Sequence, residues 1–112
     1  MMEKIDNKTE EWLDTSYKKG LDIIKWYLGD YIENLTPEML DKAFIKWKDD
    51  NTENKAPNDW IIDGLGTLFG KYIIQNINGK WVIENHLGKH LIILTDLGTK
   101  IYPIHSVSKR VL

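Results

Sequence analysis

The sequence predicts an α+β fold in which three N-terminal helices pack on one face of a three-stranded antiparallel meander. Up to about residue 77, apolar residues recur every three or four positions, as they do on amphipathic helices. After Gly79 the pattern changes to short apolar runs separated by glycine turns, which is typical of strands. Helices followed by strands are characteristic of the α+β class. We expect one domain over 1–112, with a helical half over about 8–77 and a strand half over about 80–105.

The first predicted helix is one long element with a single apolar stripe. The stripe consists of Leu13, Tyr17, Leu21, Ile24, Leu28, Ile32 and Leu35. Steps of three and four residues place these side chains on one face of a helix with about 3.6 residues per turn. Gly20 and Gly29 each cost about 1 kcal/mol relative to alanine in a helix interior, which leaves a kink or break open at either position.

The second predicted helix begins at Thr36-Pro37-Glu38. Threonine can cap the free N–H groups, proline suits the first helical position, and glutamate favours the positive end of the helix dipole. Leu40, Phe44 and Trp47 then mark an apolar edge. The polar run over residues 49–54 contains no apolar side chain, so we expect an exposed loop there.

The third predicted helix is capped by Asn58 and carries two glycines on one face. Its apolar positions are Trp60, Ile61, Leu65, Leu68, Tyr72 and Ile73. Gly66 and Gly70 lie four residues apart, so they leave room on that face for another backbone or a large ring. We expect the ring of Trp81 to pack there.

The end of this helix has two interpretations. We favour a helix that continues through residues 72–78 and ends with Gly79 as its left-handed cap. The run Tyr72-Ile73-Ile74 is also rich in strand-forming residues, which leaves open a hairpin that turns at Asn78-Gly79.

Three strands are predicted over residues 80–86, 90–95 and 99–105. The glycine turns around Gly88 and Gly98 connect them as a meander. Because proline cannot donate to a strand ladder, Pro103 places the third strand at an edge of the sheet. Residues 106–112 are compatible with a short helical turn.

Composition excludes several classes of protein. The chain has no cysteine, which excludes disulfides, cysteine nucleophiles and zinc ribbons. Its 15 basic and 17 acidic residues do not make a phosphate-coating surface, so we expect no nucleic acid as a partner. No apolar run approaches the roughly 20 residues of a membrane span, and no targeting signal is recognisable. We therefore expect no membrane association and a cytoplasmic location.

Catalytic patterns are equally scarce. No serine lies in a Gly-x-Ser-x-Gly elbow, and neither Gly64-x-Gly66 nor Gly66-x-x-x-Gly70 is followed by the lysine and serine or threonine pair of a phosphate loop. His86 and His90 flank a tight turn, with Glu84 and His105 as further candidates, but a metal site needs three or four converging ligands. We expect no enzyme activity, no cofactor and no bound metal. The alternative is a ligand-binding or enzymatic pocket between the third helix and the sheet, near Trp81, His86 and His90.

The charged residues are unevenly distributed. Residues 1–56 carry 13 acidic and 9 basic groups, whereas residues 57–112 carry 4 acidic and 6 basic groups. On the first helix, Trp12 and Trp26 lie fourteen residues apart on nearly the same face, where they either widen the core or anchor a partner. Acidic residues lie beside them at Glu10, Glu11, Asp14, Asp22, Asp30 and Glu33. An acidic and aromatic surface suits a basic protein partner.

The predicted partner-binding residues are Glu10, Glu11, Trp12, Asp14, Asp49, Asp50 and Glu53. The first four lie on the first helix, and the other three lie in the polar loop. Complementary charge would steer the encounter with a basic protein, and the tryptophan would hold it.

Short motifs in residues 60–112 resemble a known family. They are Leu65-Gly66-Thr67-Leu68-Phe69-Gly70, Asn78-Gly79-Lys80-Trp81, Tyr102-Pro103 and Lys109-Arg110. This half of the chain resembles the bacterial family called domain of unknown function 3806. The resemblance implies the helix-then-strand order and the packing of Trp81 against Gly66 and Gly70, and it assigns no catalytic residues.

The chain as a whole also resembles the small immunity proteins that protect bacteria from their own toxins. That resemblance implies a non-enzymatic protein that occludes the active site of a cognate toxin, such as a basic nuclease.

Overall fold

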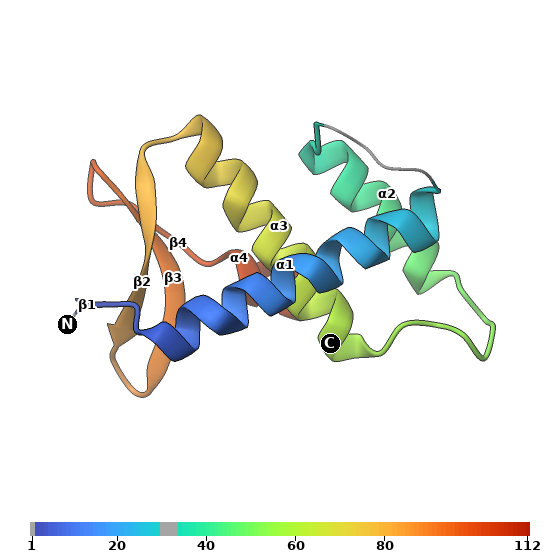
Figure 1. Cartoon of the computed structure of the whole chain (residues 1–112), viewed down its shortest axis with the longest axis horizontal. Helices are drawn as coiled ribbons and strands as arrows, with labels where there is room; N and C mark the ends of the chain where they lie inside the picture. The colour runs from blue at the N-terminus through green and yellow to red at the C-terminus, as the bar shows by residue number, and fades with distance from the viewer. Residues whose placement is uncertain (1, 30–33) are drawn as a thin grey trace.

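The α+β class is confirmed by the computed structural model, which describes residues 2–29 and 34–112. Within these residues there are four helices and four strands in the order shown in Figure 1. The elements are β1 (Met2–Lys4), α1 (Asn7–Leu28), α2 (Pro37–Lys48), α3 (Asn58–Asn76), β2 (Gly79–Asn85), β3 (Lys89–Thr95), β4 (Lys100–Ile101) and α4 (Pro103–Val111). None of the described helices is long and apolar enough to cross a membrane.

The sheet has one strand more than predicted. Its order is β1-β2-β3-β4, and all neighbouring pairs are antiparallel. The central pair β2–β3 runs from Gly79 opposite Thr95 to Asn85 opposite Lys89. The N-terminal strand β1 adds at the β2 edge, with Glu3 opposite Ile83. The predicted three-stranded meander is therefore extended by a strand from the other end of the chain.

The third predicted strand, 99–105, is wrong beyond Ile101. Only Lys100 and Ile101 pair with β3, and Pro103 begins the helix α4. Proline at the first helical position needs no N–H partner, so it starts a helix here where a strand was expected. The short helical turn expected over residues 106–112 is in fact the second half of a nine-residue helix.

The first helix is shorter than predicted. α1 begins after Asp6, whose carboxylate accepts a hydrogen bond from the N–H of Thr9 at 2.8 Å, and ends at Leu28. Gly29 takes φ +93° and ends the helix, so the break left open at this glycine is confirmed, and one unbroken helix through Leu35 is wrong. Ile32 lies outside the described residues, as do Asp30 and Glu33.

Glycines of α1 and α3 lie where these helices closely approach other parts of the fold. Gly20 does not break α1: a Cβ there would lie 2.5 Å from the carbonyl oxygen of Gly64 on α3. A Cβ at Gly70 would overlap the six-membered ring of Trp81, which confirms the predicted packing at that glycine. Gly66 instead faces α4, since its Cβ would lie 2.7 Å from the Cα of Ile104. The expectation that Trp81 packs on Gly66 is therefore wrong.

The second helix begins at its predicted cap, whereas the third helix differs from the prediction at both ends. Thr36 caps α2, with its hydroxyl 3.4 Å from the N–H of Met39. α3 is helical through Asn76, so the rival hairpin is wrong. Pro57, not Asn58, is the N-cap residue of α3. Gly79 is not a left-handed cap, because Ile77 already leaves the helix in an extended conformation and Gly79 begins β2.

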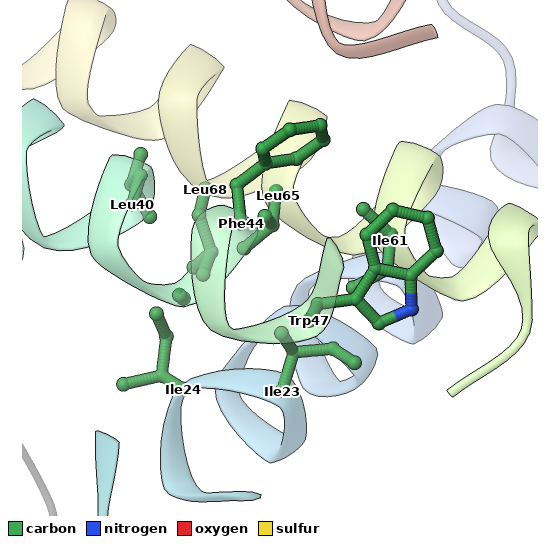
Figure 2. Packing of buried hydrophobic residues seen from close by; sticks show 9 residues of the cluster. Ile23, Ile24, Leu40, Phe44, Trp47, Ile61, Leu65 and Leu68 are labelled. Atoms are coloured by element: carbon green, nitrogen blue, oxygen red, sulfur yellow. The ribbon is translucent and has the colours of Figure 1, made fainter. Parts of the chain in front are cut away.

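A cluster of buried apolar residues lies between α1, α2 and α3, and Figure 2 shows its packing. It consists of Ile23, Ile24, Leu40, Ala43, Phe44, Trp47, Ile61, Leu65 and Leu68. Trp47 is buried there and its Nε1–H donates to the carbonyl of Ala56 at 2.7 Å, which ties the loop after α2 to the core. α2 packs on α1 and α3 at the end away from the sheet (Figure 1), so the predicted layer of three helices over one sheet face is wrong.

Candidate functional site

The predicted partner-binding acids fall into two separate groups. Glu10, Glu11 and Asp14 are exposed in the first turns of α1, whereas the loop after α2 reaches α1 near its other end, at Tyr27. Sixteen helical positions separate Glu11 from Tyr27, or roughly 24 Å at about 1.5 Å per residue. The two groups therefore do not form one face.

Asp50 is used to hold the loop in place. Its carboxylate accepts hydrogen bonds from the hydroxyl of Tyr27 at 2.7 Å and from the N–H and hydroxyl of Thr52 at 2.8 and 2.6 Å. These hydrogen bonds, those from Thr52 first, lower the pKa of Asp50. Burial and the bond to Asp50 raise the pKa of Tyr27, which also accepts from the N–H of Ala56 at 3.3 Å. The loop is thus fixed against α1, with Asp49 and Glu53 left exposed.

This fixed loop forms one wall of a groove beside Trp26. The groove has a volume of about 360 Å³, and Trp26 of α1 is 61% exposed at its edge. We call this surface the Trp26 face and define it by Asp22, Trp26, Glu53, Pro57 and Trp60. The Trp26 face brings Glu53, a predicted partner-binding residue of the loop, beside Trp26, for which the sequence left open a core or a surface position.

Charges of both signs lie at the Trp26 face. The ammonium groups of Lys19 and Lys55 lie over the rings of Trp60 and Trp47, at 5.6 and 4.4 Å from the ring centroids. The carboxylates of Asp22 and Glu53 are exposed to solvent. Lys55 also lines the groove, so the Trp26 face carries two exposed carboxylates and one ammonium that lies over an indole ring.

Asp63 adds a further acid near Lys19. Burial raises the pKa of Asp63, and Asp59 contributes in the same direction, whereas the positive charge of Lys19 opposes both. Asp59 and Asp63 lie in the first two turns of α3 and flank Trp60 in sequence.

A second groove lies at the other end of α1, against the β2–β3 hairpin. Its volume is about 570 Å³, and all three histidines of the chain line it: His86, His90 and His105. Trp12, half-buried, contributes its indole, so this predicted partner-binding residue belongs to a different surface from Trp26. We call this the histidine groove. Ile62 of α3 also lines it, but Trp81 does not, so the pocket expected near Trp81 lies away from that residue.

A buried carboxylate fixes one wall of the histidine groove. Glu84 of β2 is only 8% exposed, and it accepts from the hydroxyl of Tyr102 at 2.9 Å and pairs with the Lys100 ammonium at 2.6 Å. These two partners, Lys100 first, lower the pKa of Glu84. The same contact with Glu84 raises the pKa values of Lys100 and Tyr102.

The sequence reasoning missed Tyr102 and Ser108 as groove residues because it continued the third strand through residue 105. The signal was present: Tyr102-Pro103 followed by Ile104, Val107 and Val111 has the spacing of a helix that starts at proline. Once α4 forms, its first turns bring Tyr102, His105 and Ser108 to the hairpin.

The histidines do not converge as a metal centre. In the part of the chain that the structure describes, no three histidine, aspartate or glutamate side chains are placed to hold a metal ion.

Comparisons of the chain with protein-family models, with curated proteins and with solved structures found no significant match. The resemblances to the unknown-function family and to immunity proteins therefore stay predictions.

Proposed function

We propose that this chain is a non-enzymatic protein-binding domain that acts as an immunity protein and uses its Trp26 face to cover the active site of a basic toxin. The single observation that carries the proposal is the exposed indole of Trp26 beside Trp60, rimmed by the carboxylates of Asp22 and Glu53. Tryptophan is among the residues that dominate binding energy at protein interfaces, because it buries a large rigid surface at little cost in conformational entropy.

Electrostatics explains why the partner would be basic. The loop over residues 49–56 carries three acidic residues and one lysine. An acidic rim accelerates the encounter with a basic surface and disfavours acidic partners. Active sites of nucleases carry positive charge to bind phosphates, so they match such a rim.

The loop after α2 is held in place by hydrogen bonds, so it gives a partner a preformed surface. Asp50, Tyr27 and the indole of Trp47 hold residues 50–56 in place through side-chain hydrogen bonds. A surface that is already ordered loses less entropy on binding, which increases affinity. This arrangement supports inhibition by occlusion, in which a rigid face blocks the entrance of an active site.

The experiment is a growth-rescue assay with the toxin domain encoded beside the gene for this chain. Co-expression of the chain is expected to restore growth, and the purified proteins are expected to form a stable complex. Trp26→Ala should weaken the complex by about tenfold or more, because truncating a hot-spot tryptophan costs about 2 kcal/mol or more and about 1.4 kcal/mol is tenfold. The double reversal Asp22→Lys/Glu53→Lys should abolish rescue.

Two controls make the assignment of the face specific. Leu97→Ala removes another exposed apolar side chain, in the turn before β4, and should bind like the wild type. Glu10→Lys/Glu11→Lys reverses two exposed acids at the other end of α1 and should keep rescue. Loss of rescue in this control, with the Asp22/Glu53 reversal still active, would transfer the binding face to the start of α1. A neighbouring protein that is neither toxic nor bound would contradict the function itself.

A further inference from the structure

The histidine groove has the size of a small-ligand site and is separate from the Trp26 face. Its volume of about 570 Å³ falls within the roughly 300–1,000 Å³ typical of ligand pockets. Four elements contribute to it: α1 through Trp12, α3 through Ile62, the β2–β3 hairpin, and the first turns of α4.

One part of the lining is apolar. Trp12, Leu91 and Ile104 are each half-buried and line the groove. Ile104 is held firmly, because its backbone lies against Gly66 of α3. The partly exposed indole of Trp12 offers a face on which a planar ring can stack.

The other part of the lining consists mainly of hydrogen-bond donors. His86, His90 and His105 can each donate a ring N–H, and the ammonium of Lys89 and the hydroxyl of Ser108 lie on the same groove. The one carboxylate in the lining is Glu84, and its charge is matched by Lys100 at 2.6 Å. The groove therefore combines an apolar wall with donors and one uncompensated positive charge.

From this lining we propose that the histidine groove binds a small organic anion with a planar apolar part. The ring would pack on Trp12 and Leu91, and the phosphate or carboxylate would accept hydrogen bonds from the imidazoles and from Lys89. The three imidazoles do not form a ready metal site among the described residues, so an anion uses their donors better than a cation would use their lone pairs.

The test is an NMR titration of the full ¹⁵N-labelled chain with probes that separate charge from ring. The probes are inorganic phosphate, benzyl alcohol, phenyl phosphate and benzoate. We expect phenyl phosphate or benzoate to bind about tenfold more tightly than either single-feature probe. Shifts should concentrate on residues 84–91 and 102–108 and on the indole N–H of Trp12. The stronger of the two anions then identifies the preferred head group.

Variants distinguish the groove from general attraction of anions. His105→Ala and Lys89→Ala change exposed side chains, so both variants should fold, and each should weaken phenyl phosphate binding by about tenfold, as expected for a lost hydrogen bond to a charged group. Lys109→Ala removes an exposed cation of α4 that does not line the groove and should leave binding unchanged.

Three results would overturn the proposal. Equal affinity for all four probes would show that the groove does not combine ring and charge recognition. Shifts spread over the whole molecule would show nonspecific binding. Stoichiometric binding of Zn²⁺ that excludes phenyl phosphate would identify a metal site instead. None of these results bears on toxin binding by the Trp26 face, which the growth assay tests separately.

Discussion

At the scale of single residues, Glu84 shows how a buried carboxylate links α4 and β4 to the centre of the sheet. It lies on β2 with 8% of its surface exposed, and it receives Lys100 from β4 and Tyr102 from the start of α4. Both partners favour the ionised carboxylate, so the pKa of Glu84 lies below its ordinary value of 4.5. The contact therefore stabilises the fold only while Glu84 is ionised.

We predict that the contribution of Glu84 to stability is lost in acid. A carboxylate with a depressed pKa contributes its full stabilisation above the unfolded-state pKa and loses it as the pH falls through the lower, folded-state pKa. Glu84→Gln should therefore melt well below the wild type at neutral pH, and the gap should narrow as the pH falls below about 4.5. Thermal melts followed by circular dichroism between pH 7 and about pH 3 measure the gap.

Glu53→Gln provides the matched control, since Glu53 is an exposed carboxylate in the loop. Its melting temperature should follow the wild type at every pH. A gap between wild type and Glu84→Gln that stays constant down to about pH 3 would contradict the role given to the ionised form.

Between elements, the contact of α1 with α3 depends on two glycines. Gly20 and Gly64 face each other so closely that a Cβ on Gly64 would lie 2.8 Å from the backbone nitrogen of Gly20. Backbone atoms cannot rotate away as a side chain can, so an added methyl group must push the helices apart. The two helices also contribute Ile23, Ile24, Ile61, Leu65 and Leu68 to the core, which would lose contacts.

We predict that Gly20→Ala and Gly64→Ala each destabilise the fold although alanine is the better helix former. Overpacking of this kind costs about 1–3 kcal/mol, or more where the added methyl group contacts backbone atoms. The higher helix propensity of alanine offsets only about 1 kcal/mol of this cost. The double variant should lose less than the sum of the single variants, because the first methyl group already separates the helices. Urea denaturation gives all three free energies of unfolding.

Thr15→Ala is the control for the two glycine variants, because Thr15 is exposed on α1. It should change the free energy of unfolding by less than about 0.5 kcal/mol. Stabilisation of the chain by Gly20→Ala would show that the two backbones do not meet there.

Elements with local signals were predictable from the sequence, and those defined by distant partners were not. The start of α2 follows from Thr36-Pro37, which acts within one helical turn. β1 has three residues and becomes a strand only by pairing with β2, about eighty positions away. The first turn of α4 is predicted as the end of a strand, because short apolar runs do not distinguish helix from strand by periodicity.

For the whole molecule, the sequence identified which residue types matter but not how they are grouped. The acidic residues at the start of α1 and those of the loop are the same residue types, yet they lie near opposite ends of α1. Trp12 and Trp26 share a helix face, but one borders the hairpin and the other borders the loop. Asp50 could not be recognised as a loop-fixing residue, because its partner Tyr27 lies 23 positions earlier in the chain. Such groupings depend on how α1 packs against α3, which no short motif encodes.

Because charge and aromatic contact act at different stages of association, the proposed toxin complex should show two separable kinetic effects. Asp22→Lys/Glu53→Lys should lower the association rate, and the difference from wild type should shrink as salt rises from about 50 mM to about 500 mM, where the Debye length falls to a few ångströms. Trp26→Ala should mainly raise the dissociation rate, with little dependence on salt, since a buried indole acts after docking. Surface plasmon resonance with the toxin domain measures both rates. A salt-independent loss in the charge-reversed variant would instead indicate direct contacts of Asp22 and Glu53 in the docked complex, and it would contradict electrostatic steering as their role.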